Sequence, residues 1–122
     1  PLAELVGYGM VAGPGTSLLT QPSGAIVRAL ERAGRGVAEI DLFEVNEAFA
    51  AVVLATMTDL GVGPEVVNVN GGAIALGHPI GASGARLAGT LMSELRRRGG
   101  GLGAVALCGG GGQGDAALLQ VA

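Results

Sequence analysis

The sequence predicts an α/β fold with a five-stranded mixed sheet, in the order β-α-β-α-β-α-β-β. Short apolar runs of strand length alternate with longer stretches of helical periodicity, which is typical of strands joined by crossover helices. Glycine makes up 24 of the 122 residues and marks most of the boundaries between these segments. Only a glycine turn separates the last two apolar runs. That turn is too short for a crossover, so the last strand should run antiparallel.

The first half of the chain predicts two strand–helix units. Residues 2–12 are mostly apolar and lead into a Gly-Pro-Gly turn, which favours a strand. The helix that follows has its apolar residues on one face, with Ser23 as a candidate N-cap and glycines after its last turn. Residues 41–45 are rich in strand formers. Residues 47–60 are mostly good helix formers and stop at Gly61.

The second half predicts one more such unit and a final hairpin. Residues 66–70 have strand character, and a glycine-rich turn then leads into a helix over residues 79–98. Pro79 suits the first position of that helix, which would place His78 at the helix N-terminus. Residues 103–108 and 116–121 are the last two strands.

The helix over residues 79–98 is unusual for a helix that covers a sheet. Between Ile80 and Met92 its only charged residue is Arg86. A helix that is apolar all round is normally buried on all sides, so we expect a second layer that this chain does not supply. Small residues would let another helix approach closely, although they could equally reflect tight packing against the chain's own sheet. These residues are Gly81, Gly84, Ala85, Ala88 and Gly89.

Composition excludes several classes of function. The net charge is −3, and the few basic residues include a cluster, Arg96 to Arg98, that suits a helix C-terminus, so we expect no nucleic-acid partner. No apolar run approaches the length of a membrane span and the first residues do not indicate a secretory signal, so we expect no membrane partner and a cytoplasmic protein. One cysteine and one histidine cannot form a metal cluster or an internal disulfide.

Three polar side chains follow directly after predicted strands. Asn46 follows residues 41–45, His78 lies in the turn after the third strand, and Cys108 ends the fourth. Sites in open α/β sheets lie at the carboxyl ends of parallel strands, so all three should converge on one edge of the sheet. The neighbouring glycines 109–112 could direct backbone N–H groups at one point, as in an oxyanion-binding nest.

Each of these residues also has a purely structural interpretation. His78 could be a turn histidine, Asn46 an N-cap of the helix that follows it, and Cys108 a small core residue. Residues 109–114 match the pattern G-x-G-x-x-G, but too few residues follow to build a dinucleotide-binding unit. That match is therefore spurious.

Three motifs together resemble the C-terminal half of a thiolase over essentially the whole chain. They are Asn46-Glu47-Ala48-Phe49-Ala50, the run 70–86 with Gly77-His78-Pro79, and Cys108-x-Gly-Gly-Gly-x-Gly. Ketoacyl synthases share a Gly-His turn but would carry another histidine and a Gly-Phe-Gly motif where Cys108 stands. Thiolase-like proteins with histidine in the first motif are also a poorer match.

The resemblance implies a role for five residues. His78 would deprotonate a nucleophilic cysteine and then, with a water held by Asn46, bind the thioester oxygen. Cys108 would be the acid and base at the carbon of acetyl-CoA. The N–H of Gly110 would belong to a second oxyanion hole, and Phe49 would line the acyl pocket.

The resemblance also implies partners. Residues 1–122 would be the C-terminal domain of an enzyme of fatty-acid metabolism, such as β-oxidation, that cleaves 3-ketoacyl-CoA or condenses acyl-CoA. Coenzyme A would be a substrate, and no cofactor would be permanently bound. The nucleophilic cysteine lies in the N-terminal half of a thiolase, so this chain alone should be inactive, and the complete protein should form a homodimer or homotetramer.

The sequence departs from the thiolase pattern in two places, and two alternative functions stay open. Residues 18–23 replace a Gly-Pro pair that is usual in the family, which leaves the acyl-chain length open. The loop regions that hold coenzyme A are largely absent. The chain could instead be a stand-alone interaction module with this fold, or part of a different condensing enzyme of the ketoacyl synthase type.

Overall fold

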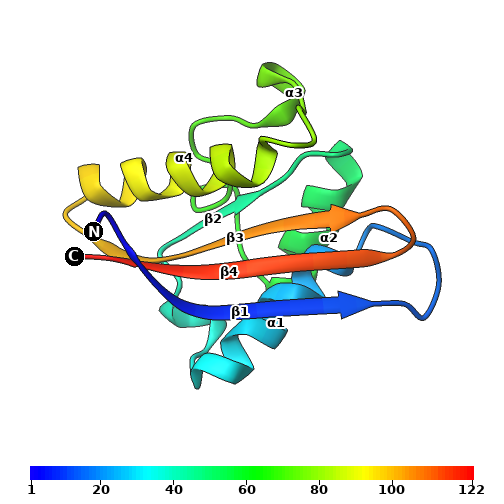
Figure 1. The fold of residues 1–122 in the computed structure, drawn as a ribbon, viewed down its shortest axis with the longest axis horizontal. Coiled ribbons are helices and arrows are strands. Elements are labelled where there is room, and N and C mark those ends of the chain that lie inside the picture. Colours follow the sequence, from blue (N-terminus) through cyan, green and yellow to red (C-terminus); the bar gives the residue numbers. More distant parts are fainter.

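The computed structural model describes residues 1–122 and contains one mixed sheet of four strands (Figure 1). These are β1 (Glu4–Ala12), β2 (Leu42–Val45), β3 (Gly101–Gly109) and β4 (Gln113–Val121), in the spatial order β1-β4-β3-β2. β2 is parallel to β3, whereas β4 is antiparallel to both of its neighbours. The prediction that only the last strand is reversed is therefore confirmed. The position of β4 between β1 and β3 was not predicted.

Helices cover both faces of the sheet (Figure 1). On one face α1 (Gln21–Ala33) packs against β1, β3 and β4, with α2 (Ala50–Leu60) beside it. On the opposite face α4 (Ser83–Arg97) packs mainly against β2 and β3. Two short elements, the 3-10 helix Val37–Glu39 and α3 (Ala73–Leu76), lie in the connections. No helix has both the length and the apolar character needed to cross a membrane.

The core consists of two apolar clusters, one on each face of the sheet. Alternation along β2 sends Phe43 and Val45 toward α1 and Leu42 toward α4. A Cβ atom on Gly103 would lie 2.6 Å from the side chain of Leu91, so this glycine permits the close approach of α4 to β3. The sheet thus holds α4 at a short distance from β3.

The predicted fifth strand over residues 66–70 is wrong. This segment makes a single parallel bridge, between Phe43 and Val67. The ladder ends at Asn68, whose φ of 47° is left-handed and whose side chain takes over the next hydrogen bonds. Its Oδ1 accepts the N–H of Val45 at 2.8 Å, and its Nδ2 donates to the Val45 carbonyl at 2.9 Å. A side-chain amide therefore replaces the backbone that would have continued the strand.

Three helices begin at other residues than predicted, and one of them is α2, which begins at Ala50 instead of residue 47. Helix α1 begins at Gln21 with Thr20 as its N-cap, so Ser23 is not the cap. Pro22 explains the earlier start, since proline is well tolerated in the first helical turn, where its missing N–H has no intrahelical partner. The Ser23 hydroxyl instead lies 2.8 Å from the Thr20 carbonyl oxygen and 2.6 Å from the carboxylate of Asp59.

Helix α4 begins at Ser83 rather than at Pro79. Residues 79–82 form a turn in which the Pro79 carbonyl accepts the N–H groups of Ala82 and Ser83, at 2.8 and 2.9 Å. Ala82, with φ −122° and ψ −15°, interrupts the helical geometry. His78 therefore lies one turn before the helix and not at its N-terminus.

The outer surface of α4 is open in this chain. A Cβ atom on Gly81, Gly84 or Gly89 would meet no other atom within 4 Å. Tight packing against the chain's own sheet is thus not the reason for these three glycines, and the expected second layer stays a prediction. Ile80, just before the helix, is 85% exposed.

Candidate active site

The structure brings Asn46 and His78 together. Asn46 directly follows β2, its N–H donates to the Ala106 carbonyl at 2.9 Å, and the residue is fully buried. Its Nδ2 lies 3.3 Å from Nε2 of His78. The N-cap interpretation of Asn46 is wrong, because α2 begins only at Ala50, with Phe49 as its N-cap. The asparagine side chain instead faces the histidine ring.

Glu47 connects three segments around this pair, a role that was not predicted from the sequence. One carboxylate oxygen accepts a hydrogen bond from Asn68 Nδ2 at 3.2 Å, and the other accepts the N–H of Ile74 at 2.8 Å. A Cβ atom on Gly72 would lie 2.5 Å from the Glu47 carboxyl carbon, so a larger residue here would push the carboxylate away from its partners. Glu47 lies in a motif quoted above, yet nothing in the spacing indicated its partners.

Ser83 is a second residue that contacts the site and was not predicted from the sequence. Its Oγ lies 2.6 Å from Nδ1 of His78 and 3.1 Å from the Pro79 carbonyl oxygen, and the residue is fully buried at the start of α4. The histidine ring is therefore held at both nitrogens, by Asn46 and by Ser83. The sequence carried no signal for this contact, because a serine among small residues has many possible roles.

A buried ion pair lies close behind Asn46. Glu44 is two residues earlier in β2 and faces the same side of the sheet, and its Oε2 lies 3.5 Å from Arg86 Nη1 in α4. Burial raises the pKa of Glu44 to about 7, although Arg86 acts to lower it. Glu44 Oε2, both terminal nitrogens of Arg86 and Asn46 Oδ1 are buried without a hydrogen-bond partner. These polar groups form a layer between β2 and α4.

Cys108 lies at the same edge of the sheet as Asn46. The two strands are parallel, and Val45 is paired with Ala106, so both β2 and β3 end here. The thiol is half-buried and makes no hydrogen bond to Asn46 or His78. Burial raises the pKa of Cys108, so at neutral pH it stays a protonated thiol.

The turn after Cys108 is shaped by glycine backbone. Gly111 and Gly112 have φ values of 85° and 77°, which favour glycine. Gly110 is exposed, and its N–H donates to no backbone carbonyl. The Gln113 side chain donates to the Gly110 carbonyl at 3.0 Å. One N–H group of this turn is thus free to bind an external acceptor.

The remaining predicted residue, Phe49, is 62% exposed, three residues after Asn46. No group of three or more histidine, cysteine, aspartate or glutamate side chains is placed to hold a metal ion. Of the predicted site residues, Asn46 and His78 are in contact. Cys108 and Gly110 lie on the adjacent strand end and turn, and Phe49 is the N-cap of α2.

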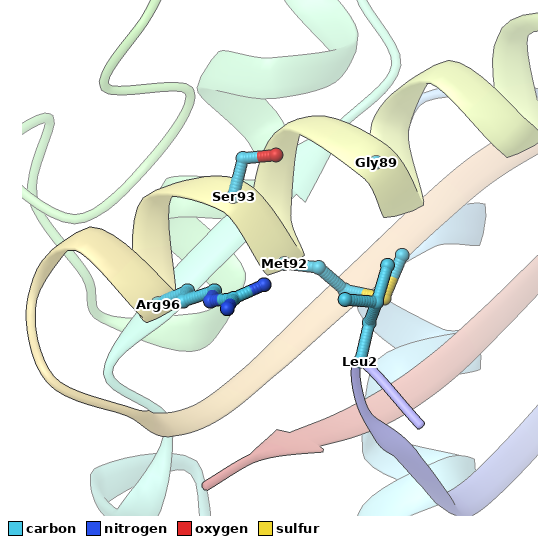
Figure 2. Close-up of a pocket in the computed structure, with 5 residues that line it drawn as sticks. All are labelled: Leu2, Gly89, Met92, Ser93 and Arg96. Carbon is cyan, nitrogen blue, oxygen red and sulfur yellow. The ribbon is translucent and has the colours of Figure 1, made fainter.

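Two hollows lie away from these residues. One of about 140 Å³ lies between α4 and the start of the chain, where Figure 2 shows Leu2 beside Met92, with Arg96 further along the helix. The other, of about 250 Å³, is an apolar groove beside α4 on the uncovered part of the sheet, with Tyr8 and Leu119 among its lining residues. Neither contains Asn46, His78 or Cys108.

Comparison with known proteins agrees with the three motifs. The family described as "Thiolase, C-terminal domain" matches residues 1–121. A probable acetyl-CoA acetyltransferase of Mycobacterium leprae (strain TN) is 56% identical over 119 residues, which cover 98% of this chain and 30% of that protein. An acetyl-CoA acetyltransferase of Shinella zoogloeoides is 50% identical over 120 residues, covering 98% of this chain and 31% of that protein.

A cytosolic acetyl-CoA acetyltransferase of Mus musculus is 48% identical over 120 residues, again 98% of this chain and 30% of that protein. The chain therefore spans about 30% of the length of the curated relatives that it matches. The match over residues 1–121 and the identities of about half show that this chain belongs to the thiolase family and corresponds to its C-terminal domain.

Proposed function

We propose that this domain supplies part of the active site of an acyl-CoA C-acyltransferase that cleaves 3-ketoacyl-CoA with coenzyme A or, in reverse, condenses two acyl-CoA molecules. The contact between Asn46 and His78 at the sheet edge that also bears Cys108 carries the proposal. The names of the relatives, acetyl-CoA acetyltransferases, support this reaction class. Coenzyme A and its thioesters are substrates here, and no cofactor stays bound.

In the cleavage direction His78 starts the reaction. Its Nε2 takes the proton of a nucleophilic cysteine, and the thiolate attacks the 3-keto carbon of the substrate. The bond between carbons 2 and 3 then breaks, and its electron pair leaves with the acetyl-CoA unit. His78 and a water held by Asn46 bind the thioester oxygen of this unit and stabilise the negative charge that develops there. The buried, unpartnered Oδ1 of Asn46 suits such a water.

Cys108 completes the release of acetyl-CoA, after which the thiol of coenzyme A attacks the acyl carbon, takes the acyl group and frees the nucleophilic cysteine. Because the raised pKa of Cys108 keeps its thiol protonated, Cys108 can donate a proton to carbon 2 of the departing acetyl-CoA. In the condensing direction the same group takes that proton away. The free N–H of Gly110 would stabilise the oxyanion formed at the acyl carbon, and the exposed ring of Phe49 would line the acyl chain. The acyl-chain length that fits beside residues 18–23 stays open.

The proposal requires an N-terminal half. Cys108 is the only cysteine of this chain, so the nucleophile must come from elsewhere. Most of the length of the relatives lies outside the matched part, which leaves room for such a half. We infer that it packs over the open side of α4 and that the complete protein is a cytoplasmic homodimer or homotetramer.

Thiolysis of acetoacetyl-CoA tests this proposal. The pure chain should show no turnover, because it lacks the nucleophile that forms the acyl-enzyme, whereas the chain joined to its N-terminal half should be active. Turnover by the pure chain would contradict the assignment of the nucleophile. A folded complete protein that neither cleaves acetoacetyl-CoA nor condenses acetyl-CoA would favour a non-catalytic interaction module.

A further inference from the structure

We propose that Ser83 is a positioning residue that fixes the protonation pattern of His78, with the proton on Nδ1 and the lone pair on Nε2. The assignment of the tautomer depends only on contacts within this chain. Its consequence for acylation rests on the function proposed above.

The hydroxyl of Ser83 determines which ring nitrogen carries the proton. A serine has one O–H to donate, and a carbonyl oxygen can only accept. Oγ lies 3.1 Å from the Pro79 carbonyl oxygen, so its proton is used there. Toward Nδ1 of His78, at 2.6 Å, Oγ can then only accept. This arrangement places the proton of the neutral ring on Nδ1.

The other side of the ring agrees with this assignment. Nε2 of His78 lies 3.3 Å from Nδ2 of Asn46, and an amide nitrogen is a donor. A neutral imidazole with its proton on Nδ1 accepts at Nε2, so both contacts are satisfied by one tautomer. In the opposite tautomer the Ser83 hydroxyl would have to donate to Nδ1, and the Asn46 amide would have to be flipped so that its oxygen faces Nε2.

Ser83 is well placed to hold this pattern. It is fully buried and begins α4, and its own N–H donates to the Pro79 carbonyl at 2.9 Å. Backbone and side chain thus bond to one acceptor, which restricts the direction of the hydroxyl. A lone pair on Nε2 is what a base for the nucleophilic cysteine needs. After proton transfer the imidazolium keeps its bond from Nδ1 to Ser83.

Nitrogen NMR of the complete protein with ¹⁵N-labelled histidine rings tests the assignment directly. The signals of His78 are those lost in a His78→Gln variant, and a pH series identifies the neutral ring. We expect the Nδ1-protonated form in the wild type and a mixture of tautomers in Ser83→Ala. Acylation of the nucleophile should slow about tenfold in Ser83→Ala with little change in KM, as for the loss of one hydrogen bond.

Ser93 provides a matched control, since it is an exposed serine in the same helix without a side-chain hydrogen bond. Ser93→Ala should change neither the NMR signals nor the acylation rate. Ser83→Thr, which keeps the hydroxyl, should retain the Nδ1-protonated form. A wild-type ring protonated on Nε2 would overturn the proposal, and this spectrum decides even if Ser83→Ala does not fold. Unchanged signals and rate in a folded Ser83→Ala would overturn it too.

The same measurements separate this proposal from the proposed function. If the wild-type ring is protonated on Nδ1 and Ser83→Ala changes it, but the complete protein forms no acyl-enzyme, then Ser83 positions His78 in a protein with another activity. If the acyl-enzyme forms while the wild-type ring is protonated on Nε2, the proposed function stands and the role of Ser83 is wrong.

Discussion

The two sides of the candidate site are built in different ways. On one side, Asn46 after β2 contacts one nitrogen of the His78 ring, and Ser83 of α4 contacts the other. On the other side Cys108 makes no side-chain hydrogen bond, and the turn after it is glycine backbone with positive φ at Gly111 and Gly112. The first side is pre-assembled by this chain. The second leaves its polar groups free for another molecule.

This difference predicts how each side responds to substitution. On the side of Asn46 and His78, truncation of one residue leaves buried neighbours without partners, so geometry and chemistry change together. At Cys108 a substitution that preserves shape has no hydrogen-bond partner to disturb. Chemistry can therefore be changed there without much effect on stability.

The largest effect is expected for Cys108→Ser in the complete enzyme. Serine keeps the shape, but its hydroxyl pKa is far above the pH of operation, so it is a poor acid and base. Exchange of the α-protons of acetyl-CoA with deuterated solvent should fall about 10²–10⁴-fold, which is the usual contribution of a general acid or base. Acylation from an activated donor and the melting temperature should change little. Exchange at the wild-type rate with unchanged stability would show that Cys108 is only a core residue.

The second largest loss of activity is expected for His78→Ala, and Asn46→Ala should show a smaller one. The first removes both the base and an oxyanion donor, whereas the second removes only the anchor of a water. Stopped-flow acylation of the nucleophile should slow about 10²–10³-fold or more in His78→Ala and less in Asn46→Ala. Thermal unfolding of the two variants shows how much of each loss is structural. Acylation at an unchanged rate in folded His78→Ala would remove His78 from the mechanism.

The smallest effect on activity is expected for Glu44→Gln, which should instead change the pH dependence of stability. The folded-state pKa of Glu44 is about 7, mainly from burial, against 4.5 for the free side chain. Between these pH values the folded protein keeps this proton and the unfolded chain releases it. The free energy of unfolding should therefore fall as pH rises from 4.5 to 7, by up to roughly 3 kcal/mol from this group.

Glu44→Gln should remove this slope, because glutamine does not titrate. The measurement is denaturant unfolding of both proteins at pH values between 4.5 and 7.5. Arg86 lowers the pKa of Glu44, whereas Glu47 and Glu94 raise it, so their charges set how large the slope is. Equal slopes in the two proteins would mean that Glu44 is ionised throughout this range. Cys108 does not titrate in this range, because burial raises its pKa, so it adds no comparable pH dependence.

The sequence by itself determined the α/β class, the reversed last strand and the sheet edge that bears Asn46 and Cys108. These depend on local rules: apolar periodicity, glycine turns, and the fact that parallel strands end at one edge of a sheet. The same rules placed Asn46 and Cys108 at strand ends, whereas the strand expected before His78 is absent and His78 follows the short helix α3. Composition also predicted that the chain has no nucleic-acid partner and no cysteine-rich metal site.

Only the tertiary structure decided how side chains distant in sequence meet. Asn68 ends the expected fifth strand by bonding Val45 through its side chain, and Ser83 reaches back to His78. Such contacts join residues through space and leave no periodic pattern, because a single buried hydrogen bond depends on where two elements happen to pack. For the same reason the position of β4 between β1 and β3 could not be read from strand order along the chain. Which hydrogen-bond partners a polar side chain finds is decided by packing, and packing is a property of the whole fold.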